Sequence, residues 1–200
     1  MRRLLALLLT LLGWAAVIIQ FYLMMENRVA SIPETTIRFF SFFTILTNII
    51  VAAYFLMEVF KKPQSLAANN KFLTPVTVYI TIVGLVYQIL LRHTWSPTGL
   101  QMIVDELLHT IVPLLAIVYW FLYYPKTKPQ YKQIAKWALY PFIYVIYILI
   151  RGNLSGFYPY PFINVTNLGL SSVLINAVFL MLVFIAISAL FMRIKSNRQS

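Results

Sequence analysis

Long runs of hydrophobic residues, interrupted by short polar segments, are the dominant pattern of this chain. A helix rises about 1.5 Å per residue, so roughly 20 apolar residues cross the ~30 Å hydrocarbon core of a bilayer. Six segments bounded by charges, prolines or asparagines contain such runs. The pattern predicts an all-α polytopic membrane protein, a single six-helix bundle over residues 1–200, with transmembrane helices at about 3–25, 37–60, 72–92, 99–124, 133–151 and 168–193.

Two parts of this pattern depart from plain apolar helices. The first helix begins with Arg2 and Arg3 like a secretory leader, but its apolar stretch is longer than a usual leader core, and we expect a retained helix. The segment 151–167 contains two glycines and two prolines, which favour an irregular loop. We expect this loop to cap one end of the bundle.

The basic residues give the predicted orientation, because Lys and Arg accumulate in short cytoplasmic loops. With the N-terminus inside, only Arg28, Arg38, Arg92 and Arg151 lie outside. The others fall on the inner side: Arg2, Arg3, Lys61, Lys62, Lys71, Lys126, Lys128, Lys132, Lys136, Arg193, Lys195 and Arg198. This bias predicts that both termini are cytoplasmic and that the chain is a multipass protein of the cell (plasma) membrane.

The composition argues against a water-soluble globular protein and against several kinds of ligand. Hydrophobic residues make up 61% of the chain and charged residues only 10%, so lipid rather than water surrounds most of it. The net charge of +11 lies in clusters between apolar runs, so we expect no nucleic-acid partner. With no cysteine and two histidines, we expect no metal site and no cofactor. The sequence sets no oligomeric state.

Polar residues of separate helices fall at a similar predicted depth in the outer half of the bilayer. Thr44 lies roughly 12 Å below the outer end of the second helix, and His109 roughly 15 Å below that of the fourth. Such groups are costly in lipid unless they face one another or water, so we expect a common cavity. The other members of this level are Gln20, Gln88 and Asn176, with Thr47 and Asn48 one turn below Thr44.

The fourth helix carries the chemistry most suited to a base. Asp105 and Glu106 precede His109 by four and three residues, so either carboxylate can lie beside the imidazole. A carboxylate there fixes the tautomer and supports the imidazolium, as a general base requires. On the fifth helix, Tyr140, Tyr144, Tyr147 and Arg151 form a stripe that could line the cavity.

Purely structural interpretations stand beside these. A threonine in a membrane helix often bonds its own backbone, and a buried histidine can join two helices. A carboxylate near a helix entrance can lie among lipid headgroups, and tyrosines often form an interfacial belt.

Three segments add a resemblance to a known family. They are FFTILTNIIVAAYF in the second helix, LLHTIVPLLAI in the fourth and YPYPFINVTNLG before the sixth. Their order and spacing, with the six-helix plan, resemble the androgen-induced-gene family of multipass proteins and their bacterial "Pr-six-Pr" relatives. The resemblance implies an intramembrane threonine hydrolase that cleaves fatty acid esters of hydroxy fatty acids. By position, Thr44 matches the essential threonine and His109, followed by Pro113, the essential histidine.

The leading hypothesis is a hydrolase of lipid or lipid-like acyl esters. Thr44 attacks the ester carbonyl, His109 accepts its proton, and Asp105 or Glu106 orients the ring. Thr47, Asn48 or Asn176 would donate to the oxyanion, and Gln20, Gln88, Tyr144, Tyr147 and Arg151 would line the pocket. The alternatives are a non-catalytic membrane protein that binds or transports a lipid or small solute, and a regulatory subunit. The absence of an inverted repeat speaks against a transporter.

Overall fold

The computed structural model describes residues 1–61, 71–124 and 130–197, and all regular structure within these ranges is helical. The chain divides into two compact units, Met1–Thr127 (unit 1) and Lys128–Ser200 (unit 2). The expectation of a single six-helix domain stays a prediction.

Six helical segments of the described residues are long and apolar enough to cross a membrane. This confirms the expected all-α fold with six membrane-length helices; which side the termini face stays a prediction. The segments are Arg2–Glu26, Phe43–Phe60, Leu73–Leu91, Gly99–Tyr123, Gln133–Ser155 and Leu170–Ser196.

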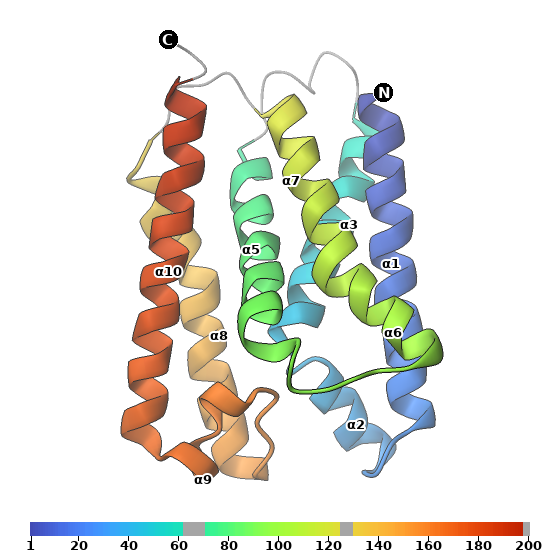
Figure 1. Ribbon diagram of the computed structural model, residues 1–200, viewed down its shortest axis with the longest axis vertical. Helices are drawn as coiled ribbons and strands as arrows, with labels where there is room; N and C mark the ends of the chain where they lie inside the picture. The colour runs from blue at the N-terminus through green and yellow to red at the C-terminus, as the bar shows by residue number, and fades with distance from the viewer. Residues whose placement is uncertain (62–70, 125–129, 198–200) are drawn as a thin grey trace. The chain divides into compact units, whose positions relative to one another are not determined.

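Unit 1 is a ring of four helical segments (Figure 1). Each segment packs against the next, and the last returns to the first. The segments are α1 (Arg2–Glu26), α3 (Phe43–Phe60), α5 (Leu73–Val86) with its extension η1 (Tyr87–Leu91), and the continuous α6 (Gly99–Glu106), η2 (Leu107–Ile111) and α7 (Val112–Tyr123).

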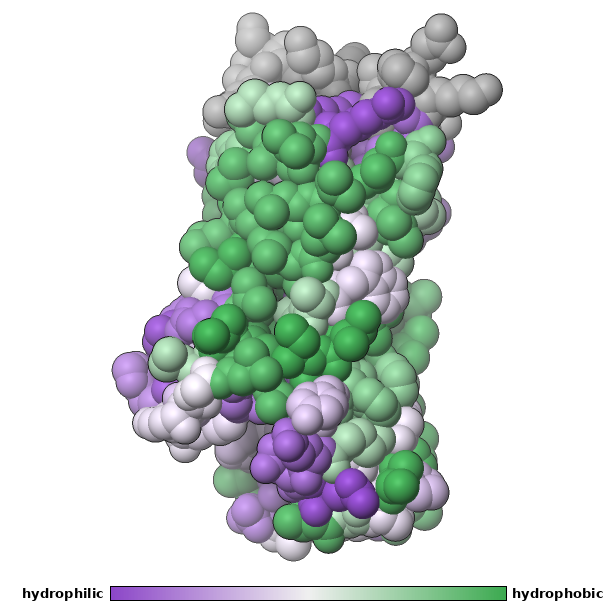
Figure 2. Space-filling view, turned by 90° about the vertical axis from the view of Figure 1, so that its right-hand side faces the viewer, coloured by the Kyte–Doolittle hydropathy of each residue, from purple (hydrophilic) through white to green (hydrophobic). Residues whose placement is uncertain are grey.

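Small residues bring α1 and α3 together. A Cβ atom placed on Gly13 would lie 3.0 Å from Cβ of Ala52, which is itself fully buried. Membrane helices associate through such small residues because lipid tails offer no hydrophobic drive toward protein. The opposite face of α1 is apolar and exposed, with Leu4, Leu7, Leu11 and Ile18 on it. Figure 2 shows this side of unit 1 as a broad hydrophobic band with hydrophilic groups above and below it.

The second predicted helix, 37–60, is wrong at its start. A separate helix, α2 (Ile32–Phe39), comes first, and α3 begins only at Phe43. The side chain of Ser41 donates to the carbonyl of Ile37 at 2.7 Å, a local bond that competes with helix continuation. Phe39 turns into the bundle and packs edge-on against Phe21 at 4.9 Å. Thr44 consequently lies in the first turn of a helix.

Unit 2 consists of α8 (Gln133–Ser155), α10 (Leu170–Asn197) and their connection, which contains η3 (Pro161–Ile163) and α9 (Val165–Leu168). The expectation of an irregular segment from 151 is wrong for its first residues, because α8 continues to Ser155. It ends at Gly156, whose φ of +70° favours glycine. The connection folds back on α8: the ring of Tyr158 lies where a Cβ of Gly152 would be.

Candidate functional site

Two wide helical turns lie against each other in unit 1. In η1 the N–H of Arg92 donates to the carbonyl of Tyr87, and in η2 the N–H of Val112 donates to that of Leu107, both five residues back. Such π-turns are rare and occur frequently at functional sites. The side chain of Gln88 in η1 donates to the Thr110 hydroxyl in η2 at 2.8 Å, so the two turns are bonded to each other.

Pro113 leaves one backbone carbonyl of η2, that of Leu108, without a donor from its own helix. The N–H of Val112 is taken by Leu107, and the next residue, Pro113, has no N–H to offer to the carbonyl of Leu108. A buried carbonyl without a donor is costly, particularly in a membrane. Nδ2 of Asn48 on α3 donates to the Leu108 carbonyl at 3.2 Å and to the Thr44 carbonyl at 2.9 Å.

The second of these bonds lies within α3, and the first joins α3 to η2, which are parts of the predicted second and fourth transmembrane helices. The two bonds also occupy both hydrogens of the Asn48 amide, so Asn48 offers no donor to an oxyanion in this arrangement, contrary to one of our suggestions. Within the described residues, its Oδ1 is buried and has no hydrogen-bond partner. Asn48 therefore joins α3 to η2 through its Nδ2, and its Oδ1 remains able to accept a hydrogen bond.

The imidazole of His109 is held by Asp105. Nδ1 lies 2.9 Å from the backbone oxygen of Asp105 and 3.2 Å from its Oδ1. A carbonyl oxygen can only accept, so Nδ1 must carry the hydrogen. In the neutral ring the lone pair is then on Nε2, and among the described residues all hydrogen bonds of the ring are made by Nδ1. Nε2 is thereby the basic nitrogen.

Tyr87 completes this group from the neighbouring helix. Its hydroxyl donates to Oδ2 of Asp105. Its ring is stacked on the imidazole of His109, with centroids 4.1 Å apart and planes 15° apart. Tyr87, Asp105 and His109, here called the Asp105 cluster, form one continuous contact between η1 and the α6–η2 segment. Sequence reasoning missed Tyr87, because an aromatic residue in a membrane helix is usually read as packing.

The other carboxylate, Glu106, takes no part in this group. It accepts from Arg92, whose guanidinium also donates to Gln88 at 2.9 Å and lies 5.8 Å from the centroid of the Tyr87 ring. Of the two carboxylates that the spacing allowed, the one beside His109 is Asp105. In residues 1–61, 71–124 and 130–197, no three His, Cys, Asp or Glu side chains lie close enough to hold a metal ion.

Thr44 and Thr47 are both buried in α3, at 7% and 0% exposure. Ile45 and Leu108, the sequence neighbours of Thr44 and His109, belong to the same buried apolar cluster. The N-terminus of α3 lies beside Thr44, where the helix dipole favours negative charge.

The remaining predicted residues divide between the two units. In unit 1, Nε2 of Gln101 on α6 donates to Oε1 of Gln20 on α1 at 2.7 Å, so Gln20 joins two helices. In unit 2, Asn176 donates to the Phe162 carbonyl at 2.9 Å.

The predicted tyrosine stripe and Arg151 also lie in unit 2. The rings of Tyr144 and Tyr147 are 6.5 Å apart, and the guanidinium of Arg151 bonds Ser155 and lies 5.2 Å from the Phe157 ring centroid. Participation of these side chains in a site with Thr44 and His109 stays a prediction.

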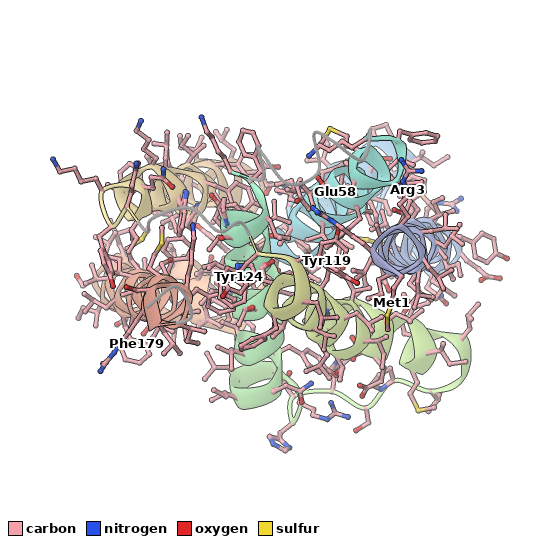
Figure 3. The ribbon with its side chains drawn as sticks, turned by 90° about the horizontal axis from the view of Figure 1, so that it is seen from above. Met1, Arg3, Glu58, Tyr119, Tyr124 and Phe179 are labelled. Carbon is pink, nitrogen blue, oxygen red and sulfur yellow. The ribbon has the colours of Figure 1, made fainter. Side chains whose placement is uncertain are left out.

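A second buried carboxylate, which we did not predict as a site, lies at the other end of α3. The side chain of Glu58 is fully buried and accepts from Arg2 at 3.1 Å and from Lys61. The Tyr119 hydroxyl accepts from Nε of Arg2 at 3.1 Å and lies 3.4 Å from Oε2 of Glu58, to which it donates. Arg2, Glu58, Lys61 and Tyr119 are called the Glu58 cluster; Figure 3 labels Glu58 and Tyr119 between α1, α3 and α7.

No protein-family model, curated protein or solved structure matches this chain.

Proposed function

We propose that this protein is an intramembrane hydrolase of lipid acyl esters, with Thr44 as nucleophile and His109 as general base. The observation that carries the proposal is the contact of His109 Nδ1 with the backbone oxygen of Asp105 at 2.9 Å, from which it follows that Nε2 is the basic nitrogen. A threonine hydroxyl is a weak nucleophile and needs such a base. The resemblance to the threonine hydrolase family points to the same pair of residues.

The proposed reaction has two halves. Oγ1 of Thr44 attacks the ester carbonyl while its proton passes to Nε2 of His109, directly or through one water. The C–O bond to the leaving alcohol then breaks, and the imidazolium returns the proton to that alcohol. Water next attacks the acyl-threonine and loses a proton to Nε2. The bond between the acyl carbon and Oγ1 then breaks, and the imidazolium returns the proton to Oγ1, which releases the fatty acid and restores Thr44.

Two features of unit 1 support stabilisation of charge during these steps. Asp105, at 4% exposure, lies beside the ring that becomes an imidazolium, and its negative charge favours that state. The N-terminus of α3 beside Thr44 favours the negative charge that develops on the former carbonyl oxygen. The exposed apolar side chains of α1 suit a substrate that arrives from lipid.

The distribution of Lys and Arg supports a cell-membrane protein with cytoplasmic termini, and hence a site in the outer half of the bilayer. The chain contains no cysteine, so a single cysteine introduced at Ser31 can report on which side of the membrane the loop between α1 and α2 lies. A membrane-impermeant maleimide should label it in intact cells; labelling only after lysis would reverse the orientation.

A binding protein without turnover is the second candidate. The buried Oδ1 of Asn48, which has no partner among the described residues, favours a bound polar group such as the hydroxyl of a lipid or small solute. Under this function the purified protein would retain an intact ligand, and replacing Asn48 would release it without any change in turnover.

Labelling by a long-chain alkyl fluorophosphonate tests the hydrolase. Wild-type protein in lipid nanodiscs should react at one residue and hydrolyse a long-chain p-nitrophenyl ester. Thr44→Val, which keeps the shape and removes the hydroxyl, should abolish both activities, whereas Thr44→Ser should retain them. Thr77→Val is the matched control, because Thr77 is buried and its hydroxyl donates to the carbonyl of Leu73 at 2.8 Å, within its own helix. Equal labelling of the wild type and Thr44→Val would overturn the proposal.

A further inference from the structure

Tyr87 contacts both Asp105 and His109 from another helix. Its hydroxyl reaches the carboxylate oxygen that is turned away from the ring, and its own ring covers a face of the imidazole. The contact joins η1 to the last turn of α6, through Asp105, and to η2, through His109. A wide turn changes the direction of successive side chains, so that Tyr87 and Gln88 both reach the opposing turn.

The carboxylate of Asp105 needs a second contact to be held in one orientation. One oxygen lies 3.2 Å from Nδ1 of His109, and the carboxylate is free to rotate about its Cβ–Cγ bond unless the other oxygen is also bonded. The Tyr87 hydroxyl provides that bond in a setting where Asp105 is almost fully buried. A hydrogen bond to an ionised acceptor is stronger than one between neutral groups.

The imidazole has a comparable freedom that the stacked ring removes. The bonds from Nδ1 to Asp105 hold one edge of the ring, while the ring of Tyr87, nearly parallel at 4.1 Å, covers one face. Together these contacts limit rotation of the imidazole and fix the direction of the Nε2 lone pair. Misplacement of a reacting group by about 1 Å can cost on the order of a hundredfold in rate.

We propose that Tyr87 is a positioning residue that acts through Asp105 and His109 to aim Nε2 at the nucleophile. The inference rests on the proposed hydrolase function. Two parts of the side chain do separate work: the hydroxyl orients the carboxylate, and the ring restrains the imidazole. Removing the hydroxyl alone should therefore lower kcat less than removing the hydroxyl and the ring together.

The test compares Tyr87→Phe and Tyr87→Leu with Tyr119→Phe in nanodiscs. Tyr87→Phe should lower kcat for the p-nitrophenyl ester on the order of tenfold and leave KM unchanged, because the hydroxyl does not touch substrate. Tyr87→Leu should lower kcat further. Tyr119→Phe removes a similar tyrosine hydroxyl bonded to a buried carboxylate in the same unit, and should leave both kinetic constants unchanged.

A double-mutant cycle separates positioning from mere structural support. In an Asp105→Asn background, Tyr87→Phe should cost little further activity, because the carboxylate that it orients is gone. Full additivity of the two changes would overturn the inference, as would an unchanged kcat in Tyr87→Phe while Thr44→Val remains inactive. A wild-type protein without turnover would instead remove the hydrolase function itself, and this inference with it.

Discussion

The Asp105 cluster and the Glu58 cluster place similar groups at opposite ends of unit 1. Each has a buried carboxylate that accepts from a tyrosine hydroxyl of a different helix. Tyr119 comes fourteen positions after Asp105 in the α6–η2–α7 segment, which is roughly 21 Å along a helix. The difference lies in the basic partner: Glu58 is paired with Arg2 and Lys61, whereas Asp105 is paired with an imidazole.

That difference decides what each cluster can do. Guanidinium and ammonium groups remain charged at neutral pH, so the Glu58 cluster can join α1, α3 and α7 but has no group that takes up and returns a proton. An imidazole does both near neutral pH. Under the proposed function, two buried carboxylates of unit 1 therefore have different roles: Glu58 holds helices together, and Asp105 supports a base.

The largest expected effect is on stability at the Glu58 cluster. Arg2→Met removes one of two cations from a fully buried carboxylate and should cost about 3 kcal/mol of unfolding free energy in mixed micelles. Adding Glu58→Gln should restore much of that loss, since no buried charge is then left short of a partner. Arg3→Met is the matched control, because Arg3 has the same charge but donates to a backbone carbonyl, that of Lys61 at 2.9 Å. Equal losses in Arg2→Met and Arg3→Met would contradict the assignment.

A smaller effect, on rate, is expected at the Asp105 cluster. Asp105→Asn should lower kcat roughly tenfold to a hundredfold, less than the ~10⁴-fold known for a triad carboxylate whose loss allows the wrong tautomer. The reason is that the backbone oxygen of Asp105 still accepts from Nδ1 at 2.9 Å and keeps Nε2 unprotonated. Glu106→Gln should leave kcat unchanged. A loss from Glu106→Gln as large as that from Asp105→Asn would show that the wrong carboxylate has been chosen.

The sequence predicts what depends on length and hydropathy, and little of what depends on contact between helices. All six membrane-length helices follow from apolar runs. The break between α2 and α3 cannot be predicted from hydropathy, because the residues before and after Ser41, from Phe39 to Phe43, are all phenylalanine. This break matters for the proposed function, because it places Thr44 at a helix N-terminus.

The candidate site shows the same division. The spacing places both carboxylates about one turn before His109 in the sequence. Which of them lies beside the imidazole depends on Arg92, which follows η1 and donates to Glu106. The π-turn at His109 is marked in the sequence only by Pro113, and its partner in η1 has no such marker. Tyr87 could have been found by asking which side chain beside Gln88 reaches the level of His109.

The smallest expected effect comes from Gly84 on α5, which packs against the backbone of His109 and against Pro113. A Cβ added there would lie 3.2 Å from the His109 carbonyl oxygen and 3.2 Å from Cβ of Pro113, so η2 must shift by a few tenths of an ångström. Gly84→Ala should therefore cost only about 1 kcal/mol of stability but lower kcat severalfold. Gly13→Ala creates a comparable contact, 3.0 Å from Cβ of Ala52, between α1 and α3. It should lower the melting temperature without lowering kcat per folded molecule, because α1 carries none of the Asp105 cluster. If both variants lost stability and neither lost kcat, the precise placement of His109 would not limit the rate, and the contrast between the two clusters would be one of charge alone.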